Sequence, residues 1–181
     1  MGRKGQRKKH TMIKTVEMSE QLEEVMEDLA EQRIEKQKTG YEKDRIKLWV
    51  KIQEMAAGKE DGSITLSYLR SGYITKKYNF YMAYHEGELF VEEESQYRYV
   101  DMSGFMEDLE EDFETICREA KKRFIRVLAG ETEYLWECYM NKLYGKFGQV
   151  VKAAVDGQKK ENGVALYYGG YMEEQSMISY V

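Results

Sequence analysis

The spacing of apolar residues changes twice along the chain, and this constrains the fold more than any other feature of the sequence. Up to Gly58, apolar residues recur every three or four positions, which is the spacing of one helix face. From Ser63 to Asp101 they alternate with other residues, as in half-buried β-strands. From Gly104 onward the helical spacing returns. The sequence therefore predicts helices, then a sheet, then helices again.

The first part predicts a helical hairpin over residues 15–58. A first helix ends at Gly40 and a second spans about Tyr41 to Ala57. The segment Gly58–Gly62 resembles a linker, so the hairpin is expected as a lobe of its own. The first helix carries a stripe of five apolar residues: Met18, Leu22, Val25, Met26 and Leu29.

The middle part predicts a tyrosine-rich antiparallel meander of three or four strands over residues 63–101. Turn signals stand at Ser71-Gly72 and at residues 85–88. A strand is also expected around Leu89 and Val91, where apolar residues alternate. Tyrosine favours half-buried sheet faces.

The last part predicts two long helices, over residues 104–128 and 131–147. Residues 149–155 and 164–172 are expected to pair as a C-terminal hairpin. Together with the meander, these elements form a predicted domain over residues 63–181. The expected fold class is α+β, with the long helices packed on one face of the sheet.

Charge is distributed unevenly. The net charge is −5, yet residues 1–14 hold six of the 28 basic residues and no acid. The other 22 basic residues stand against 33 acidic ones, which leaves −11 on the rest of the chain. A basic tail on an acidic body is typical of proteins that contact nucleic acid, although a solvated tail explains it equally well. The candidate phosphate contacts in the tail are Arg3, Lys4, Arg7, Lys8 and Lys9.

Basic and aromatic residues interleave in the meander. Aromatic rings and positive charge together are what single-stranded nucleic acid uses, through base stacking and phosphate contacts. The alternative is an ordinary sheet whose lysines protect an edge. The candidate residues are Lys76, Lys77, Tyr78, Tyr81 and Arg98.

Residues 92–114 contain ten acidic residues and one base, Arg98. These acids are expected to face water, where they mimic a phosphate track and bind a basic groove of a partner protein. The alternative is a solvated helix face. The candidate partner-binding acids are Glu92, Glu93, Glu94, Glu107, Asp108, Glu111 and Asp112.

The sequence predicts no catalytic constellation. Its only histidines are His10, in the basic tail, and His85, beside a turn. Cys117 and Cys138 are expected as small core residues. The acids are mostly consecutive on a helix, unlike a metal site, and no glycine-rich phosphate loop is present. We therefore expect no metal, no cofactor and no enzymatic activity, with a metal-dependent nuclease as the alternative.

No apolar run approaches 18 residues, and no secretory signal follows the basic N-terminus. We therefore expect a cytoplasmic protein that does not enter a membrane.

The segment Asn141–Gly148, NKLYGKFG, resembles the N-S-L-Y-G-K-F-G segment of family B DNA polymerases, which lies on their nucleotide-binding helix. Lys142 replaces the serine, and Glu137 stands where that family has a lysine. No D-T-D metal motif is present. We interpret the match as chance, or at most as a helix end that uses Tyr144-Gly145 as its cap, and we transfer no roles from these eight residues.

In length, charge layout and lack of a catalytic constellation, the chain resembles the small anti-CRISPR proteins of phages and mobile elements. The resemblance implies a stoichiometric inhibitor that binds an RNA-guided nuclease and blocks guide or target DNA engagement. The first alternative is a DNA- or RNA-binding accessory protein that uses the basic tail and the Tyr/Lys sheet face. A further alternative is a partner protein that dimerises through the stripe from Met18 to Leu29.

Overall fold

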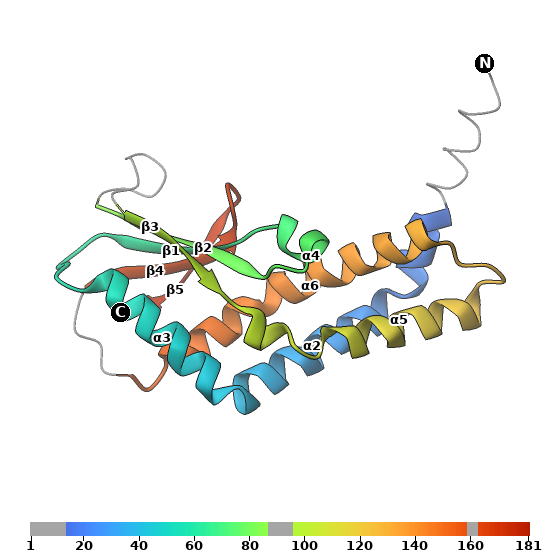
Figure 1. Cartoon of the computed structure of the whole chain (residues 1–181), viewed down its shortest axis with the longest axis horizontal. Coiled ribbons are helices and arrows are strands. Elements are labelled where there is room, and N and C mark those ends of the chain that lie inside the picture. Colours follow the sequence, from blue (N-terminus) through green and yellow to red (C-terminus); the bar gives the residue numbers. More distant parts are fainter. Residues whose placement is uncertain (1–13, 87–95, 159–162) are drawn as a thin grey trace, which may run out of the picture. The chain divides into compact units, whose positions relative to one another are not determined.

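The computed structural model describes residues 14–86, 96–158 and 163–181 (Figure 1). Residues 14–21 are helical and lead into α2. The helices and strands that follow are α2 (Glu23–Gly40), α3 (Glu42–Ala56), β1 (Ser63–Tyr68), α4 (Ser71–Thr75), β2 (Asn79–His85), β3 (Gln96–Asp101), the 3-10 helix η1 (Ser103–Met106), α5 (Leu109–Arg123), α6 (Ala129–Val155), β4 (Ala165–Gly170) and β5 (Gln175–Tyr180). The expected α+β class is confirmed.

The chain divides into two compact units. Unit 1 comprises Met1–Arg33 and Asp108–Leu143, and unit 2 comprises Ile34–Glu107 and Tyr144–Val181. The division falls inside α2 and α6, whereas the sequence suggested a boundary at the segment 58–62.

Unit 1 contains helical residues from the start of the described chain, from α5 and from the first part of α6. Residues 14–21 already take helical backbone ahead of α2. The core of this unit is formed by apolar side chains that are at most 1% exposed: Met18, Leu22, Met26, Ala30, Leu109, Ile116, Ala120, Leu135, Tyr139, Met140 and Leu143. Most of the predicted stripe on the first helix therefore faces a core within the same chain.

The described residues of unit 2 form a five-stranded sheet with the order β3-β2-β1-β4-β5. The pairs β1–β2 and β2–β3 are antiparallel, which confirms the predicted meander, and β4–β5 forms an antiparallel hairpin. The strand β4 pairs with β1 in parallel, so the sheet is mixed. The strand expected around Leu89 and Val91 lies outside the described residues.

The helix α6 continues to Val155, so the prediction of a strand over residues 149–155 is wrong. Four apolar residues of this segment are buried on one helical face: Val150, Val151, Ala154 and Val155. Their spacing also fits a helix, and their burial outweighs the roughly 1 kcal/mol that each of Gly145 and Gly148 costs in a helix interior. The partner of β4 in the hairpin is β5 instead.

The helix α5 ends at Arg123, five residues earlier than expected. Phe124 takes extended backbone, with φ −122° and ψ 130°. The carboxylate of Glu131 accepts the backbone N–H of Leu128 at 2.7 Å, which satisfies a donor at the start of α6. The segment 124–128 thus becomes the connection between α5 and α6.

One face of the sheet packs against helices of unit 2. The rings of Tyr68 and Tyr144 stack with centroids 4.7 Å apart, and Phe80 meets Phe147 edge-on at 5.4 Å. Leu48 and Ile52 of α3 are buried, and Figure 1 shows α3 and the C-terminal part of α6 on the same side of the sheet. Burial of each large apolar side chain contributes about 1.5–3 kcal/mol, so this layer is the main source of stability in unit 2.

Candidate nucleic-acid interface

Tyrosines gather on the sheet face that is opposite these helix contacts. Side chains alternate between faces along a strand, so Tyr97 and Tyr99 of β3 share this face with Tyr81 of β2, which pairs directly with Tyr99. The ring of Tyr81 lies 5.6 Å from those of Tyr97 and Tyr99 and 5.2 Å from that of Tyr171, between centroids. We call these four residues the tyrosine cluster.

The cluster has one buried ring and three exposed ones. Tyr81 is 8% exposed, whereas Tyr97, Tyr99 and Tyr171 are 62%, 63% and 46% exposed. The buried ring holds its neighbours in contact, which reduces the conformational freedom that they lose when a ligand binds. Rings presented in this way offer flat surfaces on which a planar ligand stacks.

Polar groups lie on the same face, on the strands next to the cluster. Thr65 Oγ1 lies 3.3 Å from His85 Nε2, and both residues are buried. Gln175 Nε2 donates to Ser67 Oγ at 3.3 Å and to the carbonyl of Gly170 at 2.7 Å. This face therefore combines aromatic rings with hydrogen-bonding groups.

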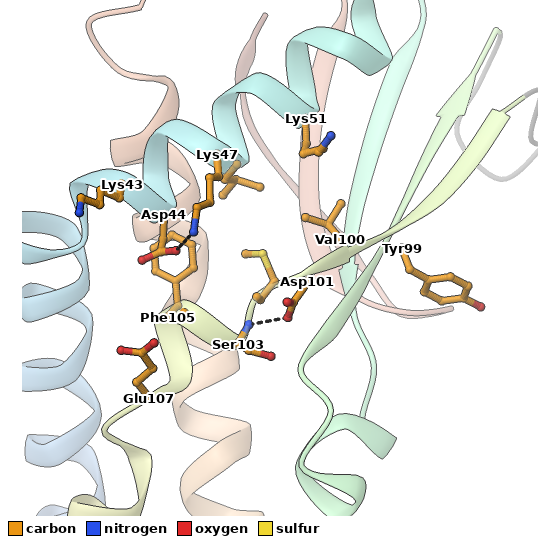
Figure 2. Close-up of a pocket in the computed structure, with 13 residues that line it drawn as sticks. Lys43, Asp44, Lys47, Lys51, Tyr99, Val100, Asp101, Ser103, Phe105 and Glu107 are labelled. Carbon is orange, nitrogen blue, oxygen red and sulfur yellow. Dashed lines mark hydrogen bonds and ion pairs between the residues drawn. The ribbon is translucent and has the colours of Figure 1, made fainter.

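A groove of about 780 Å³ lies between α3 and the segment from β3 to η1, and Tyr99 is among its lining residues. The ring of Tyr99 itself lies on the side of β3 away from α3 (Figure 2). Figure 2 shows Lys43, Lys47 and Lys51 along α3, with Lys47 reaching toward the segment that runs from the end of β3 into η1; all three line the groove. These lysines stand four residues apart, so they share one face of the helix. We call this depression the lysine groove.

Acidic residues balance much of the charge in the lysine groove. Lys47 contacts Asp44 at 3.1 Å and Lys51 contacts Glu54 at 2.9 Å. Hydrogen bonds from Ser103, which include its backbone N–H at 2.9 Å, lower the pKa of Asp101. Exposed pairs of this kind contribute about 1 kcal/mol or less, so these lysines exchange partners at small cost.

The basic residues predicted for the sheet are not all placed with its tyrosines. Arg98 lies between Tyr97 and Tyr99 in sequence, so its side chain is on the other face, where Nη1 contacts Glu54 at 2.8 Å. Lys76 and Lys77 lie in the connection from α4 to β2 and are exposed.

Among the predicted tyrosines, Tyr81 is central to the cluster. Tyr78 directly precedes β2 and is half-buried. The sequence prediction missed three members: Tyr97, Tyr99 and Tyr171. The alternation of tyrosines over residues 97–99 was the available signal, because it places both rings on one face.

The predicted acidic surface is only partly present among the described residues. Glu107 and Glu111 are exposed. Asp112 is 7% exposed, so the expectation that it faces water is wrong. The cause is Arg33, whose guanidinium donates to Asp112 and also to Asp108. The remaining predicted residues lie outside the described part of the chain: the five tail bases, Glu92, Glu93 and Glu94.

The segment that resembles family B polymerases, Asn141–Gly148, lies inside α6. The expectation that Tyr144-Gly145 caps a helix end is therefore wrong. Lys142 contacts the carboxylates of Glu23 and Glu27, and this pairing occupies its charge within unit 1. Tyr144 and Phe147 are fully buried in unit 2, so their role is packing.

The cysteines are half-buried, and burial raises the pKa of both thiols. Among the described residues, no group of three or more His, Cys, Asp or Glu side chains is placed to hold a metal ion. Within the same residues, no helix is both long and apolar enough to cross a membrane.

The chain was compared with protein-family models, with curated proteins and with solved structures, and none of the three comparisons found a match. The functional argument therefore rests on the chemistry of the side chains.

Proposed function

We propose that this protein binds single-stranded nucleic acid through the tyrosine cluster, in the cytoplasm and without catalysing a reaction. The observation that supports this function is the exposure of Tyr97 and Tyr99, at 62% and 63%, in contact with the buried ring of Tyr81. Unpaired bases stack on such rings whatever their sequence, because every base has a flat π face.

Stacking supplies the larger share of the affinity in this proposal. Removal of one stacking ring typically costs about 1–3 kcal/mol per base. Removal of two rings therefore costs about 2–6 kcal/mol, which is at least a 25-fold loss of affinity. Because stacking involves no charge, this part of the binding is insensitive to salt.

The lysine groove supplies the phosphate contacts. Tyr99 is in the cluster and also among the residues that line the groove, but its ring lies on the side of β3 away from α3 (Figure 2). Because β3 is an edge strand, a nucleic-acid strand stacked on Tyr99 reaches Lys47 and Lys51 by passing around this edge. Their carboxylate partners are on the same helix, at Asp44 and Glu54. A phosphate replaces such a partner at small cost, because each pair is exposed.

The decisive experiment measures the affinity of the full chain for a fluorescent single-stranded oligonucleotide by anisotropy. We expect the double variant Y97A/Y99A to bind at least 25-fold more weakly. The matched control Y97F/Y99F keeps both rings and retains affinity within about threefold. No binding by the wild-type chain at low salt, or equal binding by the alanine variant, contradicts the proposal.

The inhibitor function suggested by the anti-CRISPR resemblance stays a hypothesis from sequence. Of its predicted acids among the described residues, Asp108 and Asp112 are already engaged by Arg33, which leaves Glu107 and Glu111 exposed. A nuclease cleavage assay with a large molar excess of this protein separates the two functions. Inhibition that survives Y97A/Y99A but is lost in E107Q/E111Q favours the inhibitor.

A further inference from the structure

Lys14, the first described residue, contacts the connection between α5 and α6 within unit 1. The ammonium group of Lys14 donates to the backbone carbonyl of Arg126 at 2.7 Å and to the carboxylate of Glu131 at 2.9 Å. Lys14 directly follows residues 1–13, which carry five further basic residues. Lys14 and Arg126 are 112 residues apart in sequence, so this contact brings distant parts of the chain together.

The last turns of α5 and the connection that follows them are strongly basic. Between Arg118 and Leu128 there are five basic residues and one acid, Glu119, which contacts Lys122 at 2.6 Å. The cations at the end of α5 suit the negative end of the helix dipole. Arg126 lies beyond the helix and is exposed, so the dipole does not account for it. We call Lys14, Lys121, Lys122, Arg123 and Arg126 the cationic end.

A buried carboxylate holds Lys14 against the connection between α5 and α6. Glu131 is 2% exposed, and it accepts from Lys14 and from the backbone N–H of Leu128. Burial alone would raise the pKa of Glu131, but these hydrogen bonds and the charge of Lys14 hold it below its ordinary value. An ionised buried carboxylate therefore fixes Lys14 beside the connection between α5 and α6.

We propose that the cationic end is a second nucleic-acid site, which holds the phosphate backbone of duplex DNA or RNA without contacting its bases. Among residues 14–16 and 118–131, the one aromatic residue, Phe124, is half-buried, so the cationic end offers no exposed ring for stacking. A duplex concentrates about one negative charge per 1.7 Å of its axis. A surface that has cations and lacks exposed rings suits a nucleic-acid duplex, because it contacts phosphates and does not stack on bases. The tyrosine cluster, in contrast, suits unpaired bases.

The two sites are predicted to differ in their response to salt. Each phosphate contact to duplex contributes about 0.9 to the slope of log affinity against log salt. We therefore expect the duplex affinity of the wild-type chain to fall steeply with salt. The single-strand affinity should fall less, because stacking supplies most of it.

The test measures the binding of the full chain to a blunt duplex and to a single strand of equal length, by anisotropy over a salt series. The variant K121Q/K122Q/R126Q is expected to lower the duplex slope by about 3 and to leave single-strand binding within about twofold. The variant K43Q/K47Q/K51Q removes the same charge from unit 2 and is expected to leave the duplex slope unchanged. An unchanged slope in the first variant overturns the inference.

The same data separate this inference from the proposed function. Loss of single-strand binding in Y97A/Y99A with duplex binding intact supports both sites. Duplex binding by a chain that does not bind single strands supports the cationic end and contradicts the tyrosine cluster.

A competition arm tests the membrane alternative. Ile125 stands fully exposed among these cations, and this combination of apolar and basic residues also suits an anionic bilayer. The probe is a phosphatidylserine vesicle. The inference is overturned in favour of a membrane surface if the vesicles bind the wild-type chain more tightly than duplex does and fail to bind the variant Ile125→Glu.

Discussion

The guanidinium of Arg33 donates two hydrogen bonds to the carboxylate of Asp112, from Nε to Oδ2 and from Nη2 to Oδ1, each 2.8 Å long. The hydroxyl of Tyr139 donates to the same carboxylate, and Nη2 also donates to the backbone carbonyl of Asp108 at 2.8 Å. Burial alone would lower the pKa of Arg33, but Asp112 holds it above its ordinary value. Burial and the charge of Asp112 both raise the pKa of Tyr139.

Loss of Asp112 alone is predicted to destabilise unit 1 strongly. In Asp112→Leu the charge of Arg33 stays buried without its main partner, which typically costs about 3–5 kcal/mol. The double variant R33M/D112L removes both charges and is expected to recover much of this loss. Urea unfolding measures both effects, and a double variant that is no more stable than Asp112→Leu contradicts this account.

The contact between Glu131 and Lys14 is predicted to make stability depend on pH in the acidic range. The pKa of Glu131 is lower in the folded chain than its ordinary value of 4.5, so its contribution is complete above that value. It is lost as the pH falls through the folded-state pKa. The free energy of unfolding of wild type minus that of Glu131→Gln should therefore shrink from about pH 6 to pH 3. A constant difference over this range contradicts the assignment.

The lysine groove is predicted to contribute salt dependence to single-strand binding. If all three lysines contact phosphates, K43Q/K47Q/K51Q lowers the slope of log affinity against log salt by about 2, since each contact to a single strand contributes about 0.7. The affinity at high salt, where stacking dominates, should change little. If wild type and variant show the same slope of log affinity against log salt, the lysine groove is not part of the interface. The tyrosine cluster is then the binding site without it.

Two glycines of unit 2 are predicted to respond oppositely to alanine. Gly62 has φ +100°, and a Cβ there would lie 2.6 Å from both the carbonyl oxygen of His85 and the hydroxyl of Tyr84. Gly62→Ala is therefore expected to lower the free energy of unfolding by about 1–3 kcal/mol. Gly145 lies in α6, where an added Cβ would meet no neighbouring atom within 4 Å, so Gly145→Ala is expected to stabilise by about 1 kcal/mol. Thermal unfolding of both variants checks the pair.

Local periodicity was sufficient to predict the elements whose partners are neighbours in sequence. The alternation over residues 63–101 predicted the meander, because antiparallel strands joined by short connections pair with the next strand along the chain. The same alternation over residues 97–99 places Tyr97 and Tyr99 on one face of the sheet. Pairing Tyr99 with Tyr81 required the register of β2 and β3, which the sequence pattern leaves open.

The features that were missed depend on partners far away in sequence. Asp112 belongs to a run of acids that fits a solvated helix face, and its burial is decided by Arg33, 79 residues earlier. Residues 149–155 fit either a strand or a helix by local pattern, and burial within unit 2 decides for the helix. The cationic end likewise depends on the contact between Lys14 and Arg126.

The parallel pairing of β1 with β4 sets an order of events during synthesis. Ser63 pairs with Ala165, so one side of β1 lacks its strand partner until about a hundred more residues have been made. During that interval the backbone groups on this edge of β1 are open to pairing with another chain. The contact is also among the most distant in sequence, which slows sheet completion relative to the local meander. A ribosome-stalled chain that ends before β4 should therefore expose the edge of a strand that is central in the finished sheet.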